Sequence, residues 1–318
     1  MFSCSEKKTN QEEPKTPVTK DDFSKLNQEI TANPNRADLL FQRGQIFTQR
    51  NVLNQAFADL ERACSIDSTN TEYLMLLADV AFKTFQIKKT SDTFEKVVKL
   101  DPKNKTAYLK LAELYFYVKG YQKSLLYSNE ALKLDNKLVR AYYLRGFAYK
   151  EMGDTAKAVS SFNTVIDLQN GDYDAFIQLG NIYAVRGNPL ALQYYNNALK
   201  VLPSSTEALY NRGLYFQNRG EIEKAIIDYN TIIKIDPSYA DAYFNLGFIN
   251  SVMKDNFKEA IENYSTAILK NDQYLEAFFN RGVCYEKLGD KASAKKDYLS
   301  ALAILPTYQP AKDKLKKK

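Results

Sequence analysis

An all-α fold built from repeated helix-turn-helix units is the class that this 318-residue sequence predicts. The segment "FFNRGVCYEKLGD" (278–290) nearly repeats "LYNRGLYFQNRGE" (209–221). Similar segments recur at steps of 34 or 35 residues. Within each step the apolar residues keep the spacing of one helix face, and glycine or proline interrupts them. Together these observations favour a solenoid of stacked helix pairs.

The composition supports a folded chain and argues against most catalytic classes. Hydrophobic residues make up 45% and charged residues 26% of the sequence, as in ordinary folded proteins. Histidine, the commonest general base and metal ligand, is absent. The three cysteines have no zinc-type spacing, and no phosphate-binding glycine motif occurs. We therefore expect no enzymatic activity, no cofactor and no metal.

The net charge of +6 comes mostly from the C-terminal end, where "KDKLKKK" holds the one basic cluster. We interpret these lysines as a solvated chain end that complements the dipole of the last helix. A nucleic-acid-binding protein would carry a broad basic face, so nucleic acid is an unlikely partner in this interpretation. The sequence also has no apolar run of 18 or more residues, the length that a membrane-spanning helix needs.

Eight units account for residues 37–308. Each begins a first helix, called helix A here, and continues into a second, called helix B. The fifth unit is one residue short and the seventh has one residue extra. The units cover residues 37–70, 71–104, 105–138, 139–172, 173–205, 206–239, 240–274 and 275–308.

Small residues indicate where the two helices of a unit pack closely. The eighth residue of a unit and a residue about twelve later are both small in most units, as in Gly44 with Ala56 and Gly213 with Ala225. A bulkier side chain there would overpack the contact. Glycines mark the reversals between the helices, and prolines mark the ends of helix B, because proline disfavours helical backbone before it. These residues are Gly120, Gly153, Gly187, Gly220 and Gly289, and Pro102, Pro203, Pro237 and Pro306.

This pattern resembles the tetratricopeptide repeat, a 34-residue helix-turn-helix. The small eighth residue and the closing proline match the family pattern, whereas Leu, Tyr or Phe replaces the family's tryptophan at the fourth position. The resemblance covers residues 37–308. Residues 19–36 are expected to form an orphan capping helix, and residues 309–318 a basic C-terminal cap or tail. Cys64 and Cys284 fall at positions that are apolar in the other units, so both are expected in the core.

The N-terminus resembles another known signal. "MFSC" places a small residue before Cys4, as in the cysteine end of a bacterial lipoprotein signal, and residues 5–18 are polar and helix-poor. The resemblance implies a lipid on Cys4, a disordered tether over residues 1–18, and a place in the bacterial cell envelope facing the periplasm or the outside. The alternative is an ordinary disordered terminus in a cytoplasmic protein.

In the tetratricopeptide family, five positions of helix A line a concave groove. The resemblance implies that the fifth and ninth positions contribute exposed aromatic anchors, and that an asparagine row at the sixth position binds a peptide backbone. The alternatives are that the rings complete the core and that the amides bond within their own helix or to water. The candidate partner-binding residues are Tyr143, Phe147, Tyr210, Asn211, Phe244, Asn245, Phe248, Phe279 and Asn280.

The five groove positions also carry ten acidic residues against four basic ones, which suggests a basic ligand. Most of these acids lie at the second position, where the helix dipole alone would favour them. No three successive repeats hold the basic residues of the family's clamp for C-terminal carboxylates. The predicted function is therefore a scaffold that binds an extended peptide or partner protein in the groove. The alternative is an accessory subunit of an envelope, secretion or enzyme complex that docks through its convex face.

Overall fold

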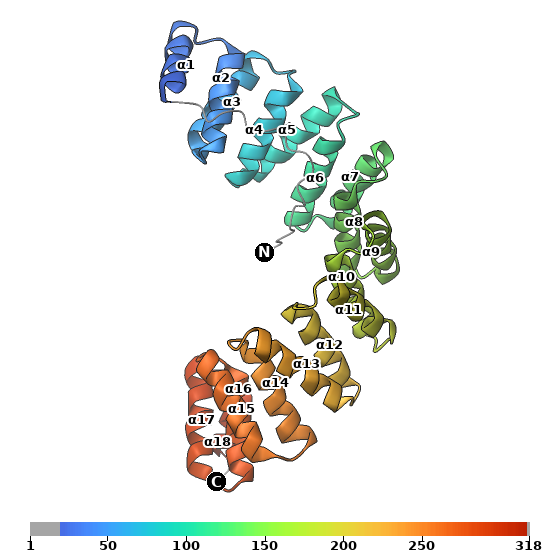
Figure 1. The fold of residues 1–318 in the computed structure, drawn as a ribbon. Coiled ribbons are helices and arrows are strands. Elements are labelled where there is room, and N and C mark those ends of the chain that lie inside the picture. The colour runs from blue at the N-terminus through green and yellow to red at the C-terminus, as the bar shows by residue number, and fades with distance from the viewer. Residues whose placement is uncertain (1–19, 317–318) are drawn as a thin grey trace. The chain divides into compact units, whose positions relative to one another are not determined.

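The computed structural model describes residues 20–316, and every regular element in that range is helical (Figure 1). This confirms the predicted fold class. One initial helix is followed by eight helix pairs and a final helix. The bounds are α1 Lys20–Ala32, α2 Ala37–Gln49, α3 Leu53–Ile66, α4 Thr71–Lys83, α5 Ile87–Leu100, α6 Lys105–Tyr117, α7 Tyr121–Leu134, α8 Val139–Glu151, α9 Thr155–Gln169, α10 Tyr173–Ala184, α11 Leu190–Val201, α12 Thr206–Asn218, α13 Ile222–Ile235, α14 Ala240–Phe248 with the π-helical η1 Ile249–Met253, α15 Phe257–Lys270, α16 Leu275–Lys287, α17 Lys291–Ile304 and α18 Gln309–Lys316.

The chain forms two compact units, Met1–Ala158 and Val159–Lys318, which are called the first and second units below. The division falls inside α9, the second helix of the fourth repeat. Each unit is described by itself. Cys4 and the predicted tether over residues 1–18 lie outside the described residues, so the lipid attachment stays a prediction.

Helix A of each repeat begins at the residue where the sequence pattern placed the start of a unit. Capping side chains explain several of these starts. Asn70 accepts hydrogen bonds from the backbone N–H groups of Glu72 and Tyr73, and Asn104 accepts one from that of Ala107. Asp172 and Ser205 cap α10 and α12 in the same way. Each cap satisfies N–H groups that have no partner inside the helix, which fixes the first turn.

The chain reverses between helices A and B at one left-handed residue per repeat. The residues with positive φ at these reversals are Asn51, Phe85, Lys119, Gly153, Gly187, Gly220, Asp255 and Gly289. The prediction was wrong in the third repeat. Gly120 has a φ of −80° and precedes α7 as its N-cap residue, while Lys119 takes the left-handed conformation at 59°. The structural position decides the backbone conformation, whatever residue occupies it: it is the fifteenth of the repeat, or the sixteenth in the seventh repeat, which has one residue extra.

Helix B ends two residues before each of the four predicted prolines. In two of these repeats, an aspartate before the proline turns the chain: Asp101 accepts from the backbone N–H of Lys103, and Asp236 accepts from that of Ser238. Asp67 makes the same turn in the first repeat without a proline. Hydrogen bonds from Ser238, first through its side chain, lower the pKa of Asp236. The aspartate and the proline thus end the helix together.

The glycine of each helix A in the second unit lies against a buried tyrosine of helix B. A Cβ atom added to Gly213 would lie 2.9 Å from the ring of Tyr229, and one added to Gly282 would lie 2.8 Å from that of Tyr298. In the first unit Gly44 faces Leu60 instead, at 2.8 Å. The close approach predicted from paired small residues is therefore present, but the glycine makes room for a large side chain of the facing helix.

The length differences of two repeats fall between helices A and B. The glycine and tyrosine that face each other are 16 residues apart in the sixth and eighth repeats, but 15 apart in the fifth (Gly180, Tyr195) and 17 apart in the seventh (Gly247, Tyr264). The missing residue shortens the connection ahead of α11, where Pro189 is the N-cap residue. The extra residue lies in η1, where the helix widens to a π turn. Both repeats thereby keep the facing pair in contact.

A single helix packs at each end of the described chain. Phe23 of α1 meets the edge of the Phe47 ring at 5.5 Å, and Leu26 and Ile30 are buried. At the other end Ala311 of α18 is fully buried, and Lys314 pairs with Glu286 at 2.8 Å. The C-terminal segment is therefore folded onto the last repeat as far as residue 316, with one of its lysines engaged in an ion pair.

Candidate binding surface

The fifth-position aromatics of the second unit form a row in which each ring is half-buried between two tyrosines. Phe244 stacks on Tyr274 at 4.9 Å between ring centroids and lies 5.6 Å from Tyr264. Two other rings are held in the same way. Tyr210 lies 6.3 Å from Tyr229 and 5.8 Å from Tyr239, and Phe279 lies 5.7 Å from Tyr298 and 5.4 Å from Tyr308. These rings therefore contribute to the core while part of each side chain stays accessible.

The two candidates of the first unit contact each other. Tyr143 stacks on Phe147 with centroids 5.9 Å apart and planes 16° from parallel. Phe147 also lies 6.1 Å from Phe116 of the preceding repeat. Only 6% of Tyr143 is exposed, whereas Phe147 is half-buried. Phe147 is thus the more accessible of the pair. In the second unit, Phe248 is half-buried as well.

The three asparagines of the predicted row differ in burial. Asn211 and Asn280 are half-buried, but Asn245 is only 5% exposed. Its Nδ2 atom makes no hydrogen bond with any described residue. Tyr210 is its polar neighbour: burial raises the pKa of the Tyr210 hydroxyl, the nearby Asn245 side chain lowers it, and the carboxylate of Asp241 raises it. An unpaired buried amide costs free energy, so Asn245 is a polar group that a small rearrangement or a ligand could satisfy.

Four carboxylates occupy the second position of helix A in the second unit: Asp174, Glu207, Asp241 and Glu276. Within the described chain, no lysine or arginine nitrogen lies within 4.0 Å of any of them. Two of the four accept hydrogen bonds from tyrosine hydroxyls: Tyr173 donates to Glu207 at 3.0 Å, and Tyr274 donates to Asp241 at 2.7 Å. Burial, and then Asp172 and Glu207, raise the pKa of Asp174. This face of the second unit therefore carries uncompensated negative charge.

Three groove acids of the first unit form ion pairs: Asp38 with Arg36, Asp79 with Lys110 at 3.1 Å, and Glu113 with Arg140 at 2.8 Å. Glu72, at the second position, forms no ion pair with a described residue. Second-position carboxylates without a basic partner are therefore more numerous in the second unit.

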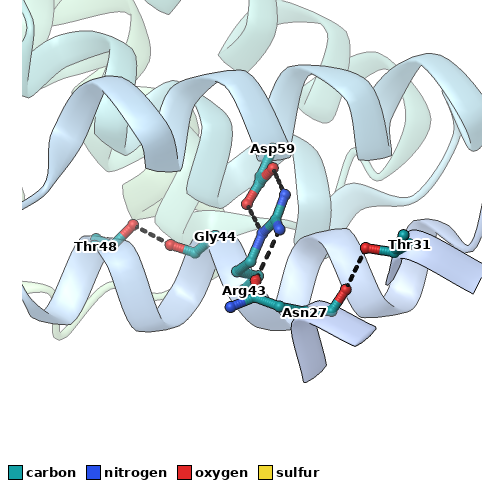
Figure 2. A network of polar contacts seen from close by, with 6 residues as sticks. All are labelled: Asn27, Thr31, Arg43, Gly44, Thr48 and Asp59. Carbon is teal, nitrogen blue, oxygen red and sulfur yellow. Dashed lines mark hydrogen bonds and ion pairs between the residues drawn. The ribbon is translucent and has the colours of Figure 1, made fainter. Parts of the chain in front are cut away.

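An arginine next to the eighth-position glycine connects three helices, a role that the sequence interpretation missed. Arg43 donates to both carboxylate oxygens of Asp59 at 2.7 and 2.8 Å, and to Asn27 Oδ1 at 2.9 Å (Figure 2). Asp59 belongs to helix B of the same repeat, and Asn27 belongs to α1, which precedes the repeat. The planar guanidinium suits this two-pronged contact.

The same contact recurs twice in the second unit. Arg212 bonds Asp228 at 2.6 and 2.9 Å and Asn196 at 2.6 Å. Arg281 bonds Asp297 at 2.8 Å through two nitrogens and Ser265 at 2.9 Å. In all three cases the partners lie 16 residues after and 16 residues before the arginine. That spacing was the signal in the sequence, and it shows that the "RG" of the repeated segments is structural.

The described residues contain no group of three or more Cys, Asp or Glu side chains placed to hold a metal ion. Cys64 and Cys284 are buried free thiols, and burial raises the pKa of each to about 11. Neither is therefore a thiolate near neutral pH. None of the helices between residues 20 and 316 has the length and apolar character that crossing a membrane requires.

The fold and this surface define an all-helical repeat protein with an acidic, aromatic face. Comparison with known proteins specifies the class further. Three family profiles match: "TPR repeat" over residues 216–251, and "Tetratricopeptide repeat" over residues 139–172 and 275–308. These matches show tetratricopeptide repeats over residues 139–172, 216–251 and 275–308, and the remaining helix pairs of the described chain have the same architecture.

Individual similarities are more distant. Over 84 residues the chain is 32% identical to the Photosystem I assembly protein Ycf3 of Acaryochloris marina (strain MBIC 11017), a match that covers 25% of this chain. The chain spans about half, 51%, of that relative's length. The C-terminal part of a TPR repeat-containing protein from Cytophaga hutchinsonii superposes with a TM-score of 0.64 at 19% identity, covering 74% of this chain and 97% of that one. PilW, a type IV pilus biogenesis factor, gives 0.56 at 18% identity, with coverage of 66% and 98%. The two structures support the fold alone.

Proposed function

We propose that the protein is a non-enzymatic scaffold whose second unit binds an extended segment rich in lysine or arginine. Proteins of the tetratricopeptide family are in general protein-interaction scaffolds. The observation that carries the proposal is the set of four second-position carboxylates without a basic partner among the described residues. A bound basic segment would supply the missing cations.

Two further features support this assignment. The edges of the Tyr210, Phe244 and Phe279 rings border the same helix A face and offer apolar and cation–π contacts. The unpaired amide of Asn245 could donate to a peptide carbonyl once the bound segment displaces the side chains above it. Part of the chain is similar to the Photosystem I assembly protein Ycf3, whose name indicates a role in assembling a larger complex. A scaffold that holds a partner segment during assembly is consistent with that role.

The test measures binding of synthetic peptides of equal length that are basic, neutral or acidic. The full chain is compared with a variant carrying Glu207→Gln, Asp241→Asn and Glu276→Gln. These substitutions keep side-chain size and leave the rings in place, so the fold should be preserved. We expect the wild type to prefer the basic peptide and the variant to lose at least tenfold in affinity, with a weaker salt dependence.

The control removes two exposed carboxylates of helices B in the second unit, through Glu223→Gln and Glu262→Gln, and the loss in affinity is compared per carboxylate removed. Equal loss in the control would mean that only net charge matters, which contradicts a defined site. The alternative function, an accessory subunit that docks through the outer face of helices B, predicts the opposite. Partner binding would then respond to the exposed Ile227 and Leu269, which are 62% and 80% exposed, and not to the carboxylates.

We further propose that the scaffold is held at a bacterial envelope membrane by a lipid on Cys4. The support is the "SC" pair followed by a polar segment. Labelling with a radioactive fatty acid in a bacterial host that expresses the full chain, compared with Cys4→Ser, tests this. Incorporation into both proteins, or into neither, would contradict it and favour the cytoplasmic alternative.

A further inference from the structure

The reversal between α4 and α5 contains an unfavourable residue that the fold does not explain. Phe85 occupies the left-handed position with a φ of 58°, where four of the eight repeats have glycine. A bulky side chain is rarely found in this conformation because its Cβ atom crowds the backbone. The side chain is also 74% exposed, so it gains little from packing. Phe85 therefore destabilises the fold in two ways, through its strained backbone and through the exposure of its apolar side chain to water.

The next reversal extends the same surface. The edge of the Phe82 ring meets Tyr117 at 5.6 Å, which places the C-terminal ends of α4 and α6 side by side. Tyr117 is 56% and Val118 40% exposed. Three exposed apolar or aromatic side chains thus project from two adjacent reversals of the first unit. We call this surface the turn edge and define it by Lys83, Phe85, Lys88, Tyr117, Val118 and Lys119.

Lysines outnumber carboxylates around these side chains. Residues 83–88 and 117–123 contain four lysines and no acidic residue. Lys83, Lys88 and Lys119 are exposed, and none forms an ion pair with a described carboxylate. Two carboxylates lie beside this segment: the pKa of Lys123 is raised by its hydrogen bond with Tyr115 and by Glu95, and Glu151 acts on Tyr121. At the reversal of the fourth repeat, Asp154 pairs with Lys157. The reversals of the second unit mix both signs, for example Glu221 with Arg219 and Lys224.

We infer that the turn edge binds an anionic lipid surface. Its apolar side chains protrude at helix reversals and line no described cavity, which suits insertion among lipid headgroups more than docking into a partner protein. Exposed lysines without ion-pair partners, next to exposed Phe, Tyr and Val side chains, are the combination that interfacial membrane binding uses. This surface lies in the first unit and is independent of the peptide face proposed for the second.

Phe85→Gly is the decisive variant because its two effects have opposite signs. Glycine removes the strain at a φ of 58°, so the fold should become more stable, while the inserting side chain is lost. The full chain, without lipid on Cys4, is mixed with vesicles of phosphatidylcholine alone or of phosphatidylcholine with phosphatidylglycerol, and bound protein is measured by flotation. We expect binding to the phosphatidylglycerol vesicles only, weakened about tenfold by Phe85→Gly.

The lysines are tested by Lys83→Gln, Lys88→Gln and Lys119→Gln together, with an expected loss of about fivefold per lysine. The matched control changes three exposed lysines at the opposite ends of the same helices, Lys99→Gln, Lys103→Gln and Lys137→Gln, and should bind as the wild type does. Equal loss in both triple variants would overturn the site in favour of net charge. Absence of vesicle binding, or a Phe85→Gly variant that binds like the wild type, would overturn the proposal, as would binding of a soluble acidic protein in place of vesicles.

Discussion

At the scale of single residues, the left-handed position of each repeat gives a graded test of backbone strain. It is occupied by Phe85, Lys119 and Asn51 in the first three repeats, each with a φ of 58–59°. We expect Phe85→Gly and Lys119→Gly to raise the free energy of unfolding by about 1 kcal/mol each. Asn51→Gly should change it by only a few tenths, because asparagine tolerates this conformation. Urea unfolding of the three variants measures the series, and equal effects at all three sites would contradict a strain-based explanation.

The glycine that faces a buried tyrosine gives a second prediction at this scale. Replacing a helical glycine by alanine normally stabilises a helix by up to about 1 kcal/mol. At Gly213 the new Cβ atom would lie 2.9 Å from the ring of Tyr229, which is fully buried and cannot move away. We expect Gly213→Ala to lower the free energy of unfolding, and Gly213→Val to lower it by a further 1–3 kcal/mol.

The control for this prediction is Ala58→Val on the exposed side of α3, which should cost less than 1 kcal/mol. Chemical denaturation of the Gly213 variants and of the Ala58→Val control gives the free energies of unfolding to be compared. A Gly213→Ala protein more stable than the wild type would mean that the helix pair opens without cost.

At the scale of helices, Arg212 holds two helices B together, an interaction that the apolar pattern of the sequence did not predict. The side chain of Asp228 is 2% exposed and receives two hydrogen bonds from Arg212. Arg212→Ala would leave this carboxylate buried without a partner, so we expect a loss of about 3 kcal/mol. The double variant Arg212→Met with Asp228→Leu removes both charges and should recover most of the loss. Thermal and urea unfolding measure both, and a single variant that loses less than 1 kcal/mol would show that water replaces the arginine.

Helix positions were predictable because each start and stop has a local cause. The 34-residue period, the capping residues before α4 and α6, and the prolines after helices B all act through the chain next to them. The place of the extra residue in the seventh repeat was not predictable. Many positions between Gly247 and Tyr264 could have absorbed it, and only packing of that pair selects the π turn at Ile249–Met253.

The candidate site was less predictable than the fold because burial depends on neighbouring repeats. The sequence placed Tyr143 and Asn245 on the same helix faces as Phe147 and Asn211, yet the first two are 6% and 5% exposed. Side chains of adjacent helices bury them, and the repeat pattern in the sequence does not predict that burial. Whether the predicted anchors bind a partner stays a prediction that the carboxylate variants can test.

At the scale of the molecule, the two units differ in how their repeats are filled. In the second unit, Tyr195, Tyr229 and Tyr264 are at most 2% exposed, and each hydroxyl bonds a polar side chain of helix A. In the first unit, Leu60 faces the glycine at the corresponding place. The second unit therefore depends on hydroxyl groups that must stay protonated.

This difference predicts that alkali unfolds the second unit first. Burial is the largest cause that raises the pKa of Tyr195, Tyr229 and Tyr264 above the usual value of 10. Because the unfolded chain releases these protons at lower pH than the folded chain does, the stabilisation is complete below about pH 10 and is lost as the pH rises. One unit above the usual pKa, each tyrosine should cost about 1.4 kcal/mol. In the first unit Tyr127 has a raised pKa through burial and Glu95, so some loss is expected there too.

Hydrogen exchange followed by mass spectrometry after brief exposure to pH 7 to 11 measures both units in one sample. Tyr229→Phe should make the second unit less sensitive to alkali, and simultaneous opening of the two units in the wild type would contradict the prediction.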